Sequence, residues 1–334
     1  MNQDTVLVTG GAGFIGSNFT SAALKLGYKV IILDKLTYSG NLDNLAEESK
    51  DPNYHFIKGD ICDTELVNKI LTDYKPSYIV HFAAESHVDN SIYGPLPFIT
   101  TNITGSFSLL ESARNYWNSI GNDKDFKFIH ISTDEVYGSL NPEDIPFDLN
   151  TPYNPSSPYS ASKAASDHLA KSWHKTYKLP VIISNCTNNF GPKQHQEKLI
   201  PKTIISAING WDIEIYGNGQ NIRDWIYVGH HVEGILQILK LGTPGKQYLF
   251  GGDQELSNID LVLKICDLIK EKIGKDAGGQ IKFIQDRPGH DFRYAVNSAK
   301  TRKELNLNYK ENFHNLLRLT IDWYISNTKS QEFN

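Results

Sequence analysis

Two adjacent carboxylates, Asp134 and Glu135, stand in the stretch ISTDEVYG (131–138), directly after a short apolar run typical of a buried strand. Two carboxyls held close together titrate at different pH values, so one can stay protonated while the other is ionised. Such a pair could supply a general acid and a general base to one reaction. Taken alone, an acidic pair at a strand end is more often a solvated turn or a helix cap, so the other motifs must decide.

A tyrosine and a lysine, Tyr159 and Lys163, stand four residues apart in PYSASK, which places both on one face of a helix. Free tyrosine has a pKa of about 10, too high for a base at neutral pH, but a nearby ammonium favours the phenolate. We therefore expect Lys163 to lower the pKa of Tyr159. The alternative is a solvated helix face, and the position after five predicted strands and a serine/threonine turn favours the chemical interpretation.

A glycine pattern in VTGGAGFIG puts Gly10, Gly13 and Gly16 at the end of the first predicted strand and the start of a helix. Glycine permits the tight turn and lets a diphosphate approach the helix N-terminus, where free amides and the helix dipole favour an anion. Asp34 ends the next run, KVIILD, and is expected to accept hydrogen bonds from both hydroxyls of an adenosine ribose. A carboxylate there repels a ribose phosphate, so NAD is favoured over NADP, although the neighbouring Lys35 weakens that inference slightly.

Two further strand ends belong to the same nucleotide site. Asp60 and Ile61 follow the third strand, where an adenine ring could be bracketed, although a helix N-cap is an equally good account of Asp60. FAAES (82–86) follows the fourth strand and is expected beside the diphosphate and the nicotinamide ribose. The sequence therefore predicts one dinucleotide site along several consecutive strand ends.

Short runs rich in Val and Ile alternate with segments of helical length and period over the first half of the chain. Strands separated by helices predict an α/β fold with a doubly wound, Rossmann-like parallel sheet. After about residue 185 the elements become mixed, which predicts an NAD-binding domain over 1–185 and a smaller mixed α/β substrate-binding lobe over 186–334, with some later elements returning to the sheet. The Pro-rich segment 141–158 is expected to form an ordered loop over the site.

Composition excludes several classes of function. The 334 residues are 40% hydrophobic and 21% charged, and their net charge of -5 argues against nucleic acid as a partner. No apolar run is long enough for a membrane helix and no signal segment is evident, so we expect a cytoplasmic protein. The three cysteines are far apart and lack metal-ligand spacing, and the doublet His230–His231 reads as the polar start of a helix, so no metal site is expected.

These motifs occur in one order along the chain and together resemble the extended short-chain dehydrogenase/reductases that act on nucleotide sugars. The segments AAESHVD, STDEVYG, NNFGP, EKLIP, IRDWIYV and RPGHDFRY are similar to those of the dTDP-glucose 4,6-dehydratase family, and the match extends over nearly the whole chain. The resemblance implies tightly bound NAD that is recycled within each turnover, and a nucleotide-sugar substrate. It also implies a homodimer formed through the two helices that flank the active strands, one of them the Tyr159 helix.

The resemblance implies the chemistry as well. The family oxidises carbon 4 of the hexose, eliminates water across carbons 5 and 6, and returns the same hydride to carbon 6. On this chain Tyr159, assisted by Lys163, would take the carbon-4 hydroxyl proton, while Thr133 hydrogen-bonds the same oxygen. Glu135 would then remove the carbon-5 proton and Asp134 would help hydroxide leave carbon 6, a step of deoxysugar biosynthesis such as the dTDP-rhamnose pathway.

Binding residues are implied by the same resemblance. The cofactor contacts are Gly10, Gly13, Phe14, Ile15, Gly16, Asp34, Lys35, Thr37, Gly40, Asp60, Ile61, Phe82, Ala83, Ala84, Ser86, Thr101, Tyr159, Lys163 and Asn189. The substrate contacts are Ser86, His87, Thr133, Asp134, Glu135, Asn188, Lys198, Leu199, Tyr216, Arg223, Asn258, Arg287, His290 and Tyr294. Arg223 and Arg287 offer planar forks suited to phosphate oxygens; alternatively, either arginine pairs with its neighbouring aspartate as a structural brace.

The chain departs from the expected pattern near the substrate lobe. Asn185 stands where an arginine is expected, Thr187 and the segment 193–196 also differ, and YVGHH (227–231) replaces an acidic pair. The nucleotide base is therefore less determined than the reaction. A UDP-glucose 4,6-dehydratase would share all the chemistry. A nucleotide-sugar 4-epimerase would not need the acids at 134 and 135, and a non-catalytic NAD-binding regulator would need none of the catalytic residues.

Overall fold

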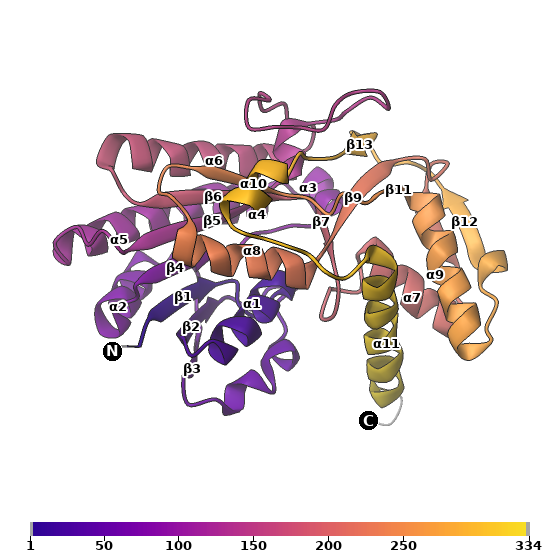
Figure 1. Cartoon of the computed structure of the whole chain (residues 1–334), viewed down its shortest axis with the longest axis horizontal. Helices are drawn as coiled ribbons and strands as arrows, with labels where there is room; N and C mark the ends of the chain where they lie inside the picture. The colour runs from indigo at the N-terminus through magenta and orange to yellow at the C-terminus, as the bar shows by residue number, and fades with distance from the viewer. Residues whose placement is uncertain (1–2, 332–334) are drawn as a thin grey trace.

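The computed structural model describes residues 3–331, and a seven-stranded parallel sheet lies at its centre (Figure 1). The strands lie in the order β10-β6-β5-β4-β1-β2-β3, and every neighbouring pair is parallel. Their bounds are β1 (Thr5–Thr9), β2 (Lys29–Asp34), β3 (Tyr54–Lys58), β4 (Tyr78–His81), β5 (Lys127–Thr133), β6 (Val181–Cys186) and β10 (Gln247–Phe250). The predicted doubly wound sheet is confirmed.

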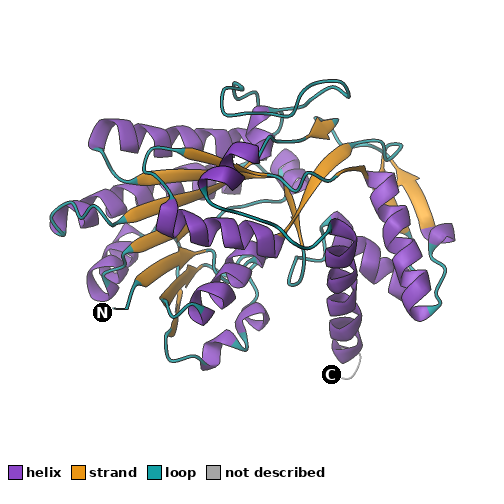
Figure 2. Ribbon diagram, viewed as in Figure 1, coloured by secondary structure: helices purple, strands orange, loops and turns teal. Residues whose placement is uncertain are grey.

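Helices cover both faces of this sheet (Figure 2). On one face lie α1 (Phe14–Lys25) and α8 (Val228–Leu241), and on the other lie α2 (Thr64–Tyr74), α5 (Ser106–Ser119) and α6 (Pro158–Tyr177). Successive strand residues point to opposite faces: Val6 and Val8 join the core beneath α1 and α8, whereas Leu7 joins the core beneath α2 and α5. This double burial explains why the strands read as continuous apolar runs.

The second lobe is built from short strands and longer helices. Its strands are β7 (Asn188–Phe190), β8 (Ile213–Tyr216), β9 (Ile222–Tyr227), β11 (Glu255–Ser257), β12 (Ile281–Ile284) and β13 (Arg293–Tyr294). β7, β11 and β13 pair with β9, and β12 pairs with β8. Its core joins residues of α7 (Leu199–Asn209), α9 (Asn258–Ile273) and α11 (Phe313–Gln331). β10 lies in the large sheet, and the division of the chain at residue 185 stays a prediction.

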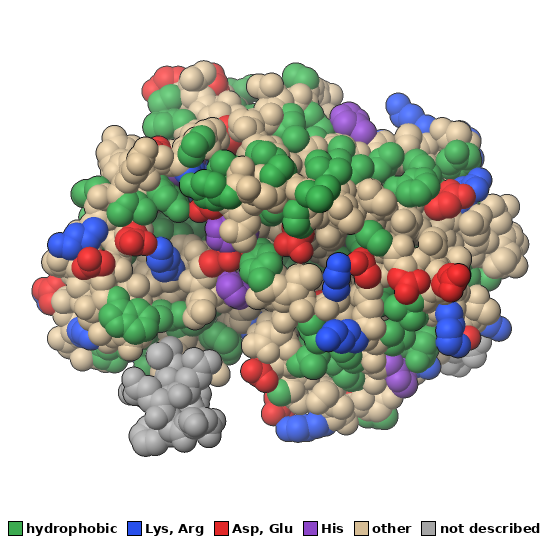
Figure 3. Space-filling view, turned by 180° about the vertical axis from the view of Figure 1, so that it is seen from behind, with side chains coloured by type: hydrophobic (Ala, Val, Ile, Leu, Met, Phe, Trp, Pro, Cys, Tyr) green, Lys and Arg blue, Asp and Glu red, His purple; other side chains and the backbone are tan. Residues whose placement is uncertain are grey.

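The remaining short elements connect these layers. They are η1 (Leu42–Leu45), η2 (Glu48–Lys50), α3 (Val88–Tyr93), α4 (Leu96–Phe98), η3 (Ile99–Gly105), η4 (Asp134–Tyr137), η5 (Gly278–Gln280) and α10 (Ala299–Glu304). Among the described residues, no helix is both long and apolar enough to cross a membrane. The face seen in Figure 3 carries acidic and basic side chains interspersed with hydrophobic ones.

Two local features position the end of β5 and the start of α6, which carry the predicted catalytic residues. β5 ends at Thr133, whose hydroxyl accepts a hydrogen bond from the Glu135 amide at 3.2 Å and so caps the short helix η4. α6 begins with a capping box in which Ser157 is the N-cap, followed by Pro158 at the first helical position. Because the helix begins there, Tyr159 lies in its first turn and Lys163 one turn later, beside the end of β5.

Candidate active site

A large cavity lies at the carboxyl ends of the parallel strands, the edge at which doubly wound sheets bind ligands. The predicted residues that line it are Gly10, Gly13, Phe14, Ile15, Gly16, Asp34, Lys35, Thr37, Gly40, Asp60, Phe82, Ala83, Ala84, Ser86, Thr101, Thr133, Asp134, Glu135, Tyr159, Lys163, Asn188, Asn189 and Lys198. The predicted residues that do not line it are Ile61, His87, Leu199, Tyr216, Arg223, Asn258, Arg287, His290 and Tyr294. The cavity thus combines the nucleotide motifs with the catalytic ones.

The glycine turn requires glycine at two places. Gly10 has φ +73°, and a Cβ there would lie 2.6 Å from the Ala83 nitrogen. A Cβ on Gly16 would lie 2.3 Å from the Gly10 oxygen. Both distances are too short for any side chain, so only glycine lets β1, α1 and the end of β4 pack this closely around the cavity.

The Asp34 carboxylate is held by the backbone. One oxygen accepts the Ala12 amide at 2.9 Å and the other accepts the Leu36 amide at 2.8 Å. A carboxylate offers about four lone-pair sites, so each oxygen keeps acceptor capacity for a ligand hydroxyl. The side chain is buried but borders the cavity, which is the arrangement expected for a ribose acceptor.

Asp60 forms an ion pair rather than a helix cap. Its carboxylate lies 2.6 Å from Lys35 Nζ and accepts the Cys62 amide at 2.9 Å. The N-cap of α2 is Asp63, which accepts the Leu66 amide at 3.0 Å, so the N-cap interpretation of Asp60 is wrong. Lys35 is thus held beside Asp60, and Ile61 is buried in the core under α2 and α5 instead of facing the cavity.

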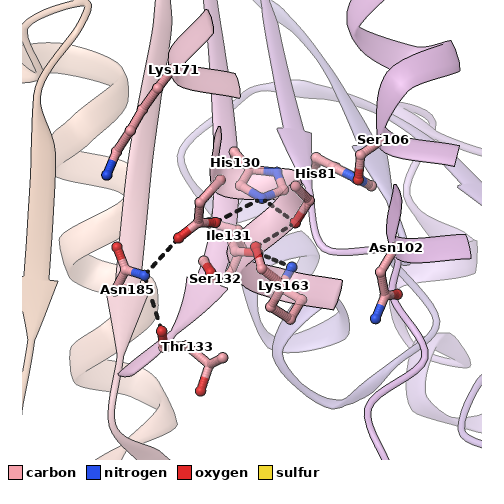
Figure 4. A network of polar contacts seen from close by, with 12 residues as sticks. His81, Asn102, Ser106, His130, Ile131, Ser132, Thr133, Lys163, Lys171 and Asn185 are labelled. Atoms are coloured by element: carbon pink, nitrogen blue, oxygen red, sulfur yellow. Dashed lines mark hydrogen bonds and ion pairs between the residues drawn. The ribbon is translucent and has the colours of Figure 1, made fainter. Parts of the chain in front are cut away.

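The predicted lowering of the Tyr159 pKa is wrong for this structure. Burial raises the pKa of Tyr159 well above its usual value, and the nearby Glu135 carboxylate adds to the effect. Lys163 is also buried, its Nζ donates to the Ile131 carbonyl at 2.8 Å (Figure 4), and burial lowers its pKa. The expectation from sequence considered the ammonium but not the loss of solvent, which acts on both groups.

The two adjacent carboxyls lie in different electrostatic surroundings. Burial, with Glu135 as the next cause, raises the pKa of Asp134 well above its usual value, and one Asp134 oxygen has no hydrogen-bond partner in the described structure. Burial also raises the pKa of Glu135, but Arg287, Arg223 and Lys198 oppose that rise. The geometry therefore favours a protonated Asp134 beside a more readily ionised Glu135.

Besides Thr133, Asp134 and Glu135, three predicted substrate residues line the cavity: Ser86, Asn188 and Lys198. Lys198 Nζ donates to the Ser86 carbonyl at 3.1 Å and so connects the second lobe to the end of β4. The Asn188 side-chain oxygen is buried without a partner in the described structure, as expected for a group that awaits a donor from a ligand. His87 and Leu199 directly follow lining residues but do not line the cavity themselves, and His87 lies 3.4 Å from the Glu197 carboxylate.

Arg287 is engaged by an acid of the first lobe. Its guanidinium lies 3.1 Å from the Asp89 carboxylate, which also accepts the Tyr216 hydroxyl at 2.8 Å. His290 lies 2.6 Å from Asp286. The predicted brace between Arg287 and its sequence neighbour is therefore wrong, because the side chain reaches across to α3 instead.

Arg223 is buried among backbone carbonyls. Its guanidinium donates to the carbonyls of Ile222, Asp291 and Phe292 at distances of 2.7–3.2 Å. It also lies 4.3 Å from the centre of the Tyr294 ring. Its sequence neighbour accepts the amides of Gly252 and Gln254 instead, so the brace is wrong here too.

Three other predicted features have partners within the protein. Asn258 is the first residue of α9, and its backbone N–H donates to the Asn221 carbonyl at 2.9 Å. In the doublet at the start of α8, His230 stacks on Tyr309, whereas His231 contacts the Asn189 amide oxygen at 3.0 Å. The described residues contain no group of three or more His, Cys, Asp or Glu arranged to hold a metal ion.

Several lining residues were not predicted from the sequence. They are Ser39, Glu85, Ile131, Ser132, Cys186, Thr187, Gln194, His195 and Glu197. Ile131, Ser132 and Cys186 belong to the ends of β5 and β6, so the strand-end rule could have found them. The segment 194–197 gave no such signal, because it reaches the cavity only through the folding of the second lobe. Conversely, no residue of the Pro-rich segment 141–158 lines the cavity. Phe147 of that segment pairs with Val296, and Leu140, just before it, pairs with Arg293 of β13.

Comparison with known proteins identifies the family. The sequence model of the GDP-mannose 4,6 dehydratase family matches residues 7–320. The chain belongs to this family. One curated member, the dTDP-glucose 4,6-dehydratase 1 of Escherichia coli K12, is 48% identical over 337 residues, which cover 97% of this chain and 93% of that protein.

Solved structures of proteins similar to this chain have the same fold. The dTDP-glucose 4,6-dehydratase DesIV of Streptomyces venezuelae, crystallised with NAD, matches with a TM-score of 0.90, 41% identity and coverage of 98% of both chains. The UDP-glucose 4-epimerase of Thermotoga maritima matches with a TM-score of 0.86 and 28% identity, covering 97% of this chain and 99% of its own. The fold is therefore shared by dehydratases and epimerases, and the residues at the cavity must separate the two reactions.

Proposed function

We propose that the chain is an NAD-dependent dTDP-glucose 4,6-dehydratase, which converts dTDP-glucose to dTDP-4-keto-6-deoxyglucose and water. The observation that carries the proposal is that Tyr159, Asp134 and Glu135 line one cavity together with the nucleotide motif. An epimerase needs the tyrosine but has no use for two carboxyls at this position. The 48% identity to a curated dehydratase over nearly the whole chain supports the same choice.

The residues around the cavity fit NAD. The amides at the start of α1 are suited to a diphosphate, and Gly10, Gly13 and Gly16 of the glycine turn line the cavity. The Asp34 carboxylate is suited to the two hydroxyls of the adenosine ribose and would repel a phosphate there. When bound, NAD would take a hydride from carbon 4 and give it back at carbon 6.

The chain's own groups would move the protons. Tyr159 takes the carbon-4 hydroxyl proton, and the Thr133 hydroxyl hydrogen-bonds the same oxygen. The resulting ketone acidifies the carbon-5 hydrogen, so the Glu135 carboxylate suffices as its base. Asp134, whose pKa is raised by burial, holds the proton that hydroxide needs to leave carbon 6 as water. The like charge of an ionised Glu135 helps Asp134 to keep that proton.

Lys163 would supply a buried positive charge near the phenol. Since burial and the Glu135 carboxylate raise the pKa of Tyr159, loss of its proton requires a compensating cation. Lys163 lies one helical turn away and is held toward β5 by the Ile131 carbonyl. Its role is therefore electrostatic, and it depends on the ammonium keeping its own proton.

Incubation with dTDP-glucose and UDP-glucose in separate reactions, followed by mass measurement of the products, tests the proposal. We expect the mass of one water to be lost, faster from dTDP-glucose. Faster loss from UDP-glucose would reassign the base. An unchanged mass with an inverted carbon 4 would identify an epimerase, and no reaction with either sugar would contradict the proposed function.

Assembly and location are also proposed. Two helices of the first lobe, α5 and α6, expose the aromatic side chains Phe107 (44%) and Tyr177 (42%). These exposed aromatic groups suit a homodimer formed through the two helices. We propose that this dimer works in the cytoplasm. Arg114 lies 4.5 Å from the Tyr177 ring centre and would extend that surface. Sedimentation of the chain and of a Phe107→Glu variant should show a dimer and a weakened dimer; a monomeric unchanged chain would contradict it.

A further inference from the structure

Asp167 is a carboxylate on α6, without exposed surface, that none of the proposed proton transfers uses. It lies one helical turn after Lys163, and its partners come from three other segments. Figure 4 labels two of these partners, His130 and Asn185. The Tyr153 hydroxyl donates to it at 2.8 Å and the Asn185 amide nitrogen at 3.1 Å, while His130 Nε2 lies 3.2 Å away. A buried carboxylate is costly to maintain, so its place behind the catalytic residues needs an explanation.

The contacts of Asp167 lead to Thr133 through one side chain. The Asn185 amide nitrogen also donates to the Thr133 carbonyl at 3.0 Å. Its amide oxygen accepts the Gln247 side chain at 2.8 Å, which fixes the orientation of the amide. Asn185 is thus held with its nitrogen between Asp167 and the last residue of β5.

A second contact holds the same strand end. Lys163 Nζ donates to the Ile131 carbonyl at 2.8 Å, two residues before the carbonyl that Asn185 binds. The carbonyls of Ile131 and Thr133 are thus held by side chains from two different elements, α6 and β6. The Thr133 hydroxyl in turn accepts the Glu135 amide. The position of Thr133 and of the two following acids therefore depends on these two carbonyl contacts.

Asp167 also supplies negative charge near Lys163. Four titratable groups of neighbouring elements influence Lys163 or are influenced by it: His81 on β4, His130 on β5, Cys186 on β6 and Asp167 on α6. Burial lowers the pKa of both histidines and raises the pKa of the thiol. These shifts favour the uncharged forms of the three groups at neutral pH. Burial raises the pKa of Asp167, but His130 and Lys163 outweigh that effect and lower it, which favours the carboxylate. The buried ammonium of Lys163 is therefore compensated from its own helix.

We propose that Asp167 is a positioning residue for the dehydratase reaction: it holds Asn185 against the Thr133 carbonyl and compensates the buried charge of Lys163. The inference rests on the proposed function, because it assigns Asp167 to the oxidation step, in which Tyr159 acts as the base. It goes beyond that function in extending the working site to a side chain that does not touch the cavity.

The variant Asp167→Asn tests both parts at once, since it keeps the shape of the side chain and removes its charge. We expect oxidation at carbon 4, measured in single turnover with bound NAD, to slow by about 10²-fold, the size expected for small displacements of reacting groups. Affinities for NAD and dTDP-glucose, measured by titration calorimetry, should stay within about twofold, because Asp167 touches neither ligand site. A role in stability alone would leave the rate of the folded protein unchanged.

The pH profile separates charge from position. Lys163 acts while protonated, so the oxidation rate falls as pH rises through its pKa. Without the Asp167 charge that pKa falls further, and in Asp167→Asn the decline should begin at lower pH. Asn185→Ala keeps the charge but removes the link to Thr133, so it should slow oxidation without moving the decline. Ser112→Ala serves as the matched control, because this serine is buried on α5 and its hydroxyl has no partner in the described structure.

The outcomes are distinguishable. If the unchanged chain forms no product from dTDP-glucose, the proposed function fails, and the inference fails with it. If the unchanged chain is active and folded Asp167→Asn oxidises the sugar at a normal rate with an unshifted decline, the inference alone is overturned. If Asp167→Asn does not fold, Asn185→Ala decides, since normal oxidation in that variant would remove the link on which the proposal depends.

Discussion

The cofactor half of the cavity and the arginine-containing part of the second lobe present their polar groups in different ways. Around the cofactor half, backbone amides fix the Asp34 carboxylate and leave it acceptor capacity toward the cavity. In the second lobe, Arg287 already pairs with Asp89, and Arg223 already donates to three backbone carbonyls. The first region is ready for its ligand as it stands. In the second, a phosphate must displace or join an existing partner, so its affinity depends on those partners as much as on the arginines.

The largest effect is expected between the two regions, at the reacting groups themselves. Tyr159→Phe should reduce oxidation at carbon 4 by roughly 10² to 10⁴, because it removes the base of the first step. In Glu135→Gln the first step should proceed, but without a base at carbon 5 the reduced cofactor and the 4-keto sugar should accumulate. Absorbance of bound NADH in single turnover, with solvent-deuterium exchange at carbon 5, distinguishes these two variants.

A control accompanies this comparison of the two variants. Both variants must still bind NAD and dTDP-glucose, since neither change alters the diphosphate sites. Asp134→Asn should resemble Glu135→Gln but be milder if water can replace the acid. Normal turnover and normal exchange in Glu135→Gln would contradict a catalytic role for Glu135 in the elimination.

The cofactor half was predictable because its signals are local. Asp34 ends a strand, Tyr159 and Lys163 share one helix, and the carboxyl ends of parallel strands necessarily meet at one edge of the sheet. The pKa of Tyr159 was not predictable in the same way, because its direction depends on burial. Burial is set by the packing of several segments of the chain, so it cannot be predicted from the six-residue motif PYSASK alone.

The second lobe was predictable only as a set of residue types. Arginine suits phosphate, and that chemistry is visible in the sequence. What holds Arg223 is a group of backbone carbonyls, from Ile222 and from residues 291–292. Every residue has a backbone carbonyl, so no residue type in the sequence indicates where a group of carbonyls will bind an arginine. Ile61 is a further example: Asp60 lines the cavity, but Ile61, the next residue, is buried in the core under α2 and α5. Which of two adjacent side chains faces the cavity is decided by the packing of the turn, not by residue type.

A second prediction sharpens the contrast between the regions. Arg287→Ala should weaken binding of dTDP by about 10- to 100-fold, in line with the loss of a charge-assisted contact, and leave NAD binding unchanged. Asp89→Asn should instead strengthen dTDP binding by a few fold, because it frees the arginine from its present partner. Titration calorimetry with dTDP and with NAD measures both. Equal weakening of both ligands by Arg287→Ala would mean that the regions are not separate.

On the cofactor side, Asp34→Ala should reduce discrimination between NAD and NADP by about tenfold. The carboxylate is expected to bind the ribose hydroxyls and to repel a phosphate, and both effects disappear with it. Lys35 is already paired with Asp60 at 2.6 Å, so it is not expected to attract the phosphate in the unchanged chain. Binding of both dinucleotides by fluorescence titration tests this, and equal affinity of the unchanged chain for NAD and NADP would contradict the assignment.

A smaller effect links the two regions through pH. Glu135 works as a base when ionised, so elimination is lost as pH falls through its pKa, which burial raises and Arg287 opposes most. Arg287→Ala should therefore raise that pKa further and move the acid-side decline to higher pH, with Arg223, Lys198 and Asp291 unchanged around it. Rates measured at saturating substrate across pH check the direction. A decline that stays in place would mean that the field of Arg287 does not reach the base.

The smallest effect is expected for the thiols, because no proposed step uses one. Cys62 and Cys266 do not line the cavity, whereas Cys186 does, and burial raises the pKa of its thiol to about 12. A thiol that stays protonated at neutral pH is a poor nucleophile, so Cys186 is expected to pack rather than react. Its sulfur accepts the Asn189 amide at 3.2 Å, a contact that serine could keep. Replacement of all three by serine should leave turnover within a few fold and lower thermal stability, mostly through the buried Cys186 and Cys266. If the triple variant stayed folded and bound both NAD and substrate, yet gave no product, the mechanism would need a nucleophile that the two carboxyls and Tyr159 do not provide.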